Sequence, residues 1–171
     1  MNPSAAVALC AALLTLAGCG TGDNDAASQA ISDSIMESQD DDPTSGVFAM
    51  ERKEADCIGD GFVDEIGVEQ LQEYGLLTED LKRAEGMTDA EMSTQDAESA
   101  SIALFDCTNV SKMMSEAFSS AGTLDAQTRA CMEDALSEDV LRDMFTLMFS
   151  GKQEEAGQLA TEPLTECAGA R

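Results

Sequence analysis

The chain contains no histidine and no tryptophan, and it is poor in basic and aromatic residues. Without histidine it lacks the side chain that most often acts as a general base near neutral pH and that most often binds metals. Only 9 of its 171 residues are Lys or Arg, against 34 Asp or Glu, so the formal net charge is −25. Such a charge repels nucleic acid and anionic lipid head groups, and we expect no nucleic-acid partner.

The short motifs of common catalytic and metal sites are also missing. There is no GxSxG elbow, P-loop, GxGxxG or HExxH in the sequence, and no pair of cysteines has CxxC spacing. The acidic run 40–42 does not begin a calcium-binding loop, because Ser45 stands where that loop requires glycine and Pro43 interrupts it. We therefore expect no metal site and no cofactor.

The apolar run near the start of the chain has the length of a secretory leader. Residues 5–18 are apolar or small except for Thr15. A run of this length is too short to cross a bilayer as a helix, which takes about 20 residues. It suits the apolar region of a signal peptide.

This run ends at Leu16-Ala17-Gly18-Cys19, which resembles the lipobox of bacterial lipoproteins. The resemblance implies that residues 1–18 are a signal peptide removed before Cys19, and that Cys19 then carries a diacylglyceryl thioether. Two acyl chains give stable anchoring where one chain is marginal. The resemblance thus implies that the lipid bilayer holds the protein at the extracytoplasmic face of the cell membrane, through acylated Cys19.

The leader departs from the usual pattern in its charge. Signal peptides normally begin with positive residues, whereas the first basic residue here is Arg52. Either the true start lies upstream or the signal is a weak one.

The cysteines divide by position. Cys10 lies inside the leader and Cys19 ends the lipobox. The remaining four are Cys57, Cys107, Cys131 and Cys167. An even number of cysteines in an exported domain predicts two disulfides.

The segment 19–45 is acidic, contains no base, and is rich in Ser, Gly and Asp. Its sizeable apolar side chains are few: Ile31, Ile35 and Met36. So little apolar surface does not offset the entropy lost on folding. We therefore expect a disordered acidic linker over 19–45, which tethers a folded domain to the anchor.

From residue 46 to 171 the apolar residues recur mostly at helical spacing, which predicts a single helical domain. The expected helices carry the apolar stripes Ala55–Ile66, Val68–Tyr74, Ala97–Ala121 (kinked near Thr108), Leu124–Leu136 and Leu141–Phe149. A last helix is expected to start near Thr161, with Pro163 in its first turn. No run of alternating β-branched residues indicates a strand, so the expected fold is an all-α, small multi-helix bundle.

A weak internal similarity suggests how the cysteines pair. Residues 57–62 resemble 131–136, and residues 104–107 resemble 164–167. If the halves are duplicated units, Cys57 joins Cys107 and Cys131 joins Cys167, while the other two connectivities stay open. The order of lipobox, acidic spacer and cysteine-bearing helices is similar to that of small uncharacterised exported proteins of high-GC Gram-positive bacteria. That resemblance brings no known activity.

Two functional hypotheses follow. The first is a membrane-anchored binding or interaction module of unknown ligand, with an envelope or extracellular partner. The Met/Phe stripe at 141–149 is either an adaptable groove for an apolar partner or, more commonly for such stripes, core packing. The alternative is an extracytoplasmic hydrolase that uses the carboxylates of Asp60, Asp64 and Glu65. Because clusters of acids arise by chance in so acidic a chain, we favour the non-enzymatic module.

Overall fold

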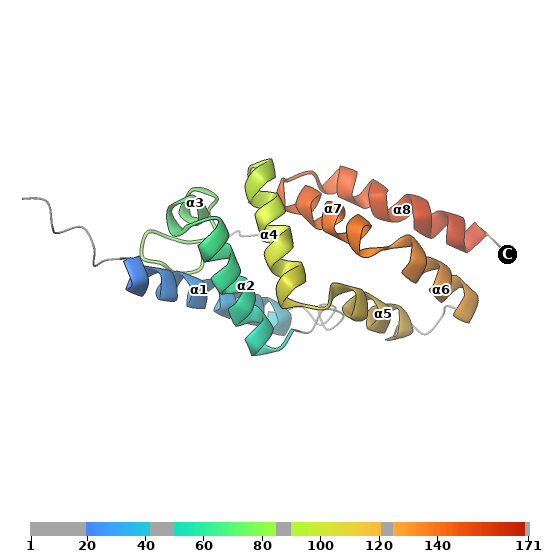
Figure 1. Ribbon diagram of the computed structural model, residues 1–171, viewed down its shortest axis with the longest axis horizontal. Coiled ribbons are helices and arrows are strands. Elements are labelled where there is room, and N and C mark those ends of the chain that lie inside the picture. Colours follow the sequence, from blue (N-terminus) through green and yellow to red (C-terminus); the bar gives the residue numbers. More distant parts are fainter. Residues whose placement is uncertain (1–19, 42–49, 85–89, 121–124, 170–171) are drawn as a thin grey trace, which may run out of the picture.

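The computed structural model describes residues 20–41, 50–84, 90–120 and 125–169, and these contain eight helices (Figure 1). In chain order they are α1 (Gly20–Asp41), α2 (Arg52–Glu65), α3 (Val68–Glu73), α4 (Thr94–Cys107), α5 (Val110–Ser120), α6 (Ala126–Ala135), α7 (Glu138–Phe149) and α8 (Gln153–Gly169). Within the described ranges the one β-type contact is an isolated bridge between Leu77 and Arg83. The predicted all-α class is confirmed.

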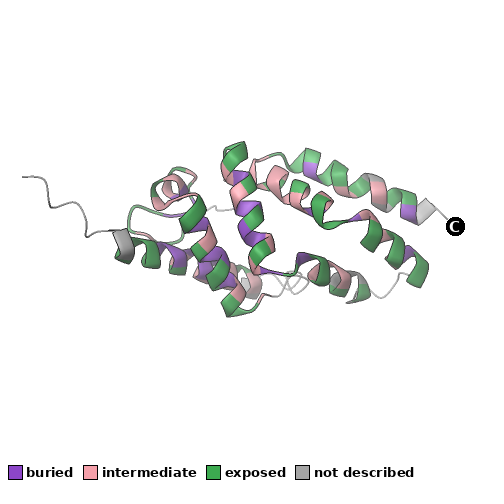
Figure 2. Ribbon diagram, in the orientation of Figure 1, coloured by how far each residue is buried: buried purple, intermediate pink, exposed green. Residues whose placement is uncertain are grey.

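The helices pack as a series of neighbours along an elongated molecule. Helix α2 lies between α1 and α4, α4 packs on α7, and α7 packs on α8 (Figure 1). Helix α6 contacts α5 and α8 at the far end. Buried residues gather on α1, α2 and α4, whereas α5, α6 and α8 are mostly exposed (Figure 2). The hydrophobic core therefore sits mainly among α1 to α4 and reaches the later helices through Val110, Leu136 and Leu141.

Helix α1 contradicts the predicted disordered linker. Residues 20–41 are helical, and Ala27 and Ile31 are 0% and 2% exposed. The buried polar residues of this helix are Ser28, Ser32 and Ser34. The prediction failed because it counted large apolar side chains, whereas α1 is buried mainly through small ones. The helical body therefore includes residues 20–41 and does not begin at 46, while 1–19 and 42–49 lie outside the described residues.

Two glycines of α2 allow its neighbours to come close. A Cβ built on Gly59 would lie 2.4 Å from the carbonyl oxygen of Ser28 in α1. A Cβ on Gly61 would lie 2.8 Å from the Cβ of Ala103 in α4. Each glycine lowers helix propensity by about 1 kcal/mol relative to alanine. This cost is offset because both helices can then pack directly against the α2 backbone.

The helix boundaries follow local capping chemistry. Ser93 and Ser137 accept hydrogen bonds from backbone N–H groups in the first turns of α4 and α7. Gly67, Gly75 and Gly151 follow α2, α3 and α7 with φ between 70° and 89°, a conformation that favours glycine. These residues set where each helix begins or ends, largely as the sequence indicates.

Two predicted boundaries differ from the structure. The kink expected near Thr108 is a complete break between α4 and α5, because Thr108 is extended with φ −135° and ψ 156°. The last helix begins at Gln153 rather than near Thr161, and Pro163 lies inside it. The prediction placed Pro163 in a first turn, where its missing N–H matters least. The predicted helix ends at 121–124 lie outside the described residues.

Substitution of Gly59 by alanine tests the close packing of α1 on α2. The new Cβ must displace main-chain atoms of α1, so we expect the free energy of unfolding to fall by about 1–3 kcal/mol. Gly157 in α8 is the matched control, because no heavy atom lies within 4 Å of a Cβ built there. Gly157→Ala should stabilise the protein by about 0.5–1 kcal/mol through helix propensity. Urea unfolding measures both, and equal effects of the two substitutions would contradict the packing argument.

Candidate functional site

An apolar pocket of about 560 Å³ lies where α1, α2 and α4 meet the end of α7. Twelve of its thirteen lining residues are apolar, the other is Gln153, and none of the thirteen carries a charge. The lining residues are Ile31, Ile35, Met50, Ile58, Phe62, Leu76, Ala90, Met92, Leu104, Phe145, Met148, Phe149 and Gln153. In a chain with so many carboxylates, this surface is set apart by its lack of charge.

The pocket has a closed floor and an exposed edge. Ile31 and Ile58 are each 2% exposed and belong to the core, whereas Met148 is 43% exposed. Gln153, the first residue of α8, is also exposed. Met148 and Gln153 therefore mark the mouth of the pocket, while α1 and α2 supply its floor.

Aromatic packing holds the α7 side of the pocket in place. Phe149 packs edge-on against Phe62 of α2, with 6.1 Å between ring centroids, and lies 6.2 Å from Phe145. The carbonyl oxygen of Phe149 accepts a 2.9 Å hydrogen bond from the backbone N–H of Met92. These contacts fix α7 against α2 and against the segment that leads into α4.

The structure divides the predicted Met/Phe stripe between two roles. Leu141 is 1% exposed and belongs to the core. Phe145 and Phe149 pack against that core and, together with Met148, also line the pocket. The pocket as a whole was not predicted, because its walls come from residues between 31 and 153 that only the fold brings together.

The carboxylates proposed for a hydrolase do not form a cleft. Asp60, Asp64 and Glu65 are all exposed on α2, whose opposite face is buried. None of them is among the residues that line the described pockets. These three carboxylates are thus exposed to solvent on the outer face of α2.

A different set of acids lines a polar hollow of about 710 Å³ beside α3. Its carboxylates belong to Asp23, Glu69, Glu73 and Glu79, all of which are exposed. Among the described residues, no three Asp, Glu, Cys or His side chains are placed to hold a metal ion.

Tyr74, the only tyrosine, belongs to a hydrogen-bonded cluster at the start of α4. Its hydroxyl donates to the carboxylate of Asp96 and accepts from the backbone N–H of Ser93 at 3.0 Å. The hydroxyl of Ser93 also donates to the Asp96 carboxylate, at 2.8 Å, and accepts from the backbone N–H of Asp96. The cluster caps α4 and ties it to the end of α3, so its role is structural.

One ion pair beside the pocket wall alters the pKa values of its members. Glu51 precedes α2 and follows Met50, which lines the pocket. The Lys53 ammonium donates to the Glu51 carboxylate at 2.7 Å, which lowers the pKa of Glu51 and raises the pKa of Lys53. Both side chains are exposed, so the pair belongs to the start of α2 and not to the pocket interior.

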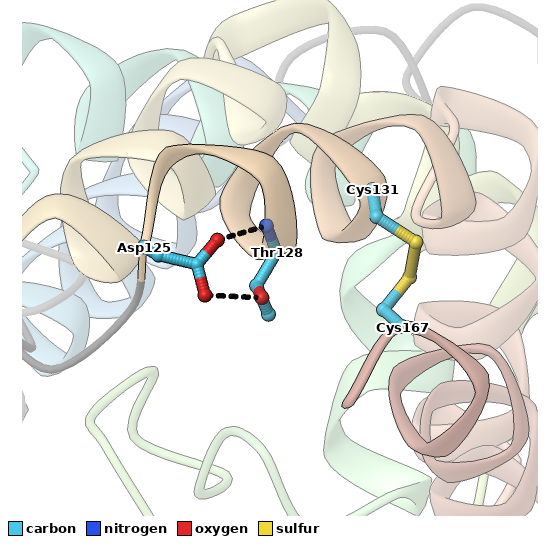
Figure 3. Close-up of a disulfide and its surroundings, with 4 residues drawn as sticks. All are labelled: Asp125, Thr128, Cys131 and Cys167. Carbon is cyan, nitrogen blue, oxygen red and sulfur yellow. Dashed lines mark hydrogen bonds between the residues drawn. A yellow bond between two sulfur atoms is a disulfide. The ribbon is translucent and has the colours of Figure 1, made fainter. Parts of the chain in front are cut away.

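The two disulfides join the cysteines that the internal similarity pairs. Cys57 bonds to Cys107 with 5.6 Å between Cα atoms, and Cys131 bonds to Cys167 with 5.7 Å. The first links α2 to α4 beside the pocket residue Ile58. The second links α6 to α8 (Figure 3). Each disulfide joins the sixth residue of one helix to a cysteine in the next helix but one along the chain.

Figure 3 also shows how the start of α6 is held. The Asp125 carboxylate accepts from the backbone N–H of Thr128 at 2.9 Å, and its other oxygen accepts from the Thr128 hydroxyl at 2.9 Å. This cap fixes the turn that precedes Cys131. Few side chains of α6 and α8 are buried. At this end of the molecule the cap and the disulfide therefore stabilise the helices in place of core packing.

The disulfides indicate an extracytoplasmic domain, because such bonds persist in oxidising compartments. Cys19, the predicted lipidation site, lies outside the described residues. None of the described helices combines the length and the apolar character required to cross a bilayer.

Comparison of the chain with protein-family models, with curated proteins and with solved structures found no match. No relative therefore supplies an activity, a ligand or a functional residue. The function must be argued from the pocket, the charges around it and the disulfides.

Replacing a disulfide with two serines tests what each crosslink contributes. On the chain-entropy model, the free energy of unfolding should fall by about 4 kcal/mol for Cys57→Ser with Cys107→Ser, which opens a loop of 50 residues. Cys131→Ser with Cys167→Ser opens a loop of 36 residues and should cost nearly as much. Urea unfolding of the oxidised proteins measures both losses. Reductant breaks the disulfides of the wild type and of both variants, so under reducing conditions all three should have the same free energy of unfolding. A difference that persists would show that the serine side chains themselves cause the loss of stability.

Proposed function

We propose that the protein is an extracytoplasmic lipoprotein, anchored through Cys19, that binds an apolar ligand in the pocket between α1, α2, α4 and α7. The observation that carries this proposal is the uncharged pocket in a chain with a net charge of −25. Ligand sites are typically concave, mostly apolar cavities of about 300–1,000 Å³ with a few polar groups. The pocket has this size and this composition.

The packing of the pocket supports a ligand. An unfilled apolar hollow forfeits dispersion contacts for the side chains that line it. An apolar ligand restores those contacts without removing a charge from water. Met148 at the edge offers an adaptable side chain that can move to admit such a ligand.

The position of α1 gives the anchor a role in binding. Because α1 begins at Gly20, no long tether separates the lipobox cysteine from the helical body. Ile31, in the pocket floor, lies about 17 Å along the helix from Gly20 at 1.5 Å per residue. A lipidated Cys19 would therefore hold the pocket near the membrane surface, where apolar molecules are concentrated.

The anchor is tested by Cys19→Ser. Without the thiol no diacylglyceryl group can be attached, so we expect the protein to leave the membrane fraction and its intact mass to lose the lipid. Cys10→Ser is the matched control, because Cys10 lies within the expected leader and should change neither result. Retention of Cys19→Ser in the membrane fraction, or a wild-type mass without lipid, would contradict the proposed anchor.

The pocket is tested with the apolar fluorophore N-phenyl-1-naphthylamine and unlipidated protein of residues 20–171, which contains every described helix. We expect saturable binding that Met148→Glu weakens at least about tenfold, because it places a charge at the mouth of an apolar site. Ile102→Glu on α4 is the matched control: Ile102 is 48% exposed and does not line the pocket. It adds the same charge and should change affinity less than about twofold.

Two results of this titration would count against the pocket. Absence of saturable binding to the wild-type protein would remove the proposed ligand site. Equal weakening by Met148→Glu and Ile102→Glu would show that total charge, and not the pocket, controls the binding of the probe.

A further inference from the structure

We infer that the pocket takes a single-chain lipid whose head group carries no negative charge. This inference rests on the proposed function and specifies its ligand. Three features of the pocket carry it: its volume, its one polar lining residue and the charges around its mouth.

The volume matches one alkyl chain. A methylene group occupies slightly less space than a water molecule, whose share of the liquid is about 30 Å³. The pocket volume of about 560 Å³ therefore accommodates one long alkyl chain. Met50, Met92 and Met148 lie in its wall, and their unbranched side chains adapt readily to a flexible chain.

The polar chemistry of the pocket suits an uncharged head. Among the described residues that line the pocket, Gln153 is the one polar residue, and its amide both donates and accepts hydrogen bonds. It can therefore bind an ester carbonyl or a hydroxyl at the exposed edge. No Arg or Lys is among these described lining residues, so they offer a carboxylate or phosphate head no charged hydrogen-bond donor.

The charged residues beside Gln153 along the chain, together with Glu91, are mostly negative. The Glu91 side chain lies over Gly151, two residues before Gln153, and Glu154 and Glu155 directly follow Gln153. Lys152 is the one base in this stretch of α8 and its approach. Three carboxylates against one ammonium leave a local excess of negative charge, which repels an anionic head.

The other bases of the chain do little to change this balance. In the described part of the chain at least five of the nine Lys and Arg residues form ion pairs with carboxylates: Arg52, Lys53, Arg83, Lys112 and Arg142. Most of the positive charge is therefore already neutralised by neighbouring acids.

The test is displacement of bound N-phenyl-1-naphthylamine by two amphiphiles of equal chain length, each below its micelle concentration. Monomyristoylglycerol is uncharged and myristate is anionic. At low salt we expect monomyristoylglycerol to displace the probe at a concentration at least about tenfold lower than myristate, since potentials of several kT act on the anion. At 1 M salt, where the screening length is about 3 Å, this ratio should shrink severalfold.

Variants that remove carboxylates test which of them weaken the binding of myristate. Glu154→Gln with Glu155→Gln should lower the myristate concentration needed for displacement and leave that of monomyristoylglycerol unchanged. Glu166→Gln, on an exposed position about 18 Å further along α8, is the matched control and should change neither.

The outcomes separate this inference from the proposed function. If the probe binds and responds to Met148→Glu, but both amphiphiles displace it equally or myristate does so better, the inference is overturned and the pocket stands. The same holds if neither amphiphile displaces the probe. If the probe itself does not bind, the proposed ligand site fails, and this inference fails with it.

Discussion

At Gly59 the backbones of α1 and α2 pass so close together that no side chain fits between them. This contact makes α1 part of the folded body, because the buried face of α1 consists largely of Ala and Ser and has few large side chains to bury. Through it, Ile31 and Ile35 become one wall of the apolar pocket. Without it, α2 would lack a neighbour on one side and the pocket would lack its floor.

Six consecutive residues of α2, 57–62, contact α1, α4 and the pocket. Cys57 is bonded to α4, Gly59 admits α1, and Gly61 lies against Ala103 of α4. Ile58 and Phe62 line the pocket between these contacts. One turn and a half of helix therefore joins three helices and forms part of the site.

The segment of α6 that resembles residues 57–62 shows the structural effect of Gly59 and Gly61. Residues 131–136 carry Glu133 where α2 has Gly59, and Ala135 where it has Gly61. Glu133 is exposed and accepts a hydrogen bond from the Ser115 hydroxyl of α5 at 2.7 Å, so α5 meets α6 there through side chains. The disulfide to α8 is kept, but the core around it is thin. The same pattern of disulfide, from the sixth residue of one helix to the next helix but one, thus occurs in a compact half and in an open half.

Features encoded locally could be predicted from the sequence, and features created by packing could not. The all-α class follows from the helical spacing of apolar residues, and the disulfides join the cysteines that the weak internal similarity paired, although that similarity left the other two connectivities open. Helix α1 was missed because an acidic segment rich in Ser and Ala has the composition of a linker. Its order depends on a glycine on another helix, which composition does not reveal.

The candidate site was only partly predictable for the same reason. The stripe that contains Met148 indicated an apolar surface on α7, but not that α1 and α2 would complete a pocket around it. Gln153 gave no signal, because the sequence placed the start of the last helix near Thr161. The surplus of acids was evident from composition, whereas their absence from the pocket wall appears only in the fold.

The central claim is that α1 folds as part of the body through its contact with Gly59. Hydrogen–deuterium exchange of the amides of residues 27–35 tests it most directly, because protection reports the stability of each segment. The account predicts that these amides are protected about as strongly as those of α2. Exchange of residues 27–35 at the rate of an unstructured chain, while α2 stays protected, would contradict it.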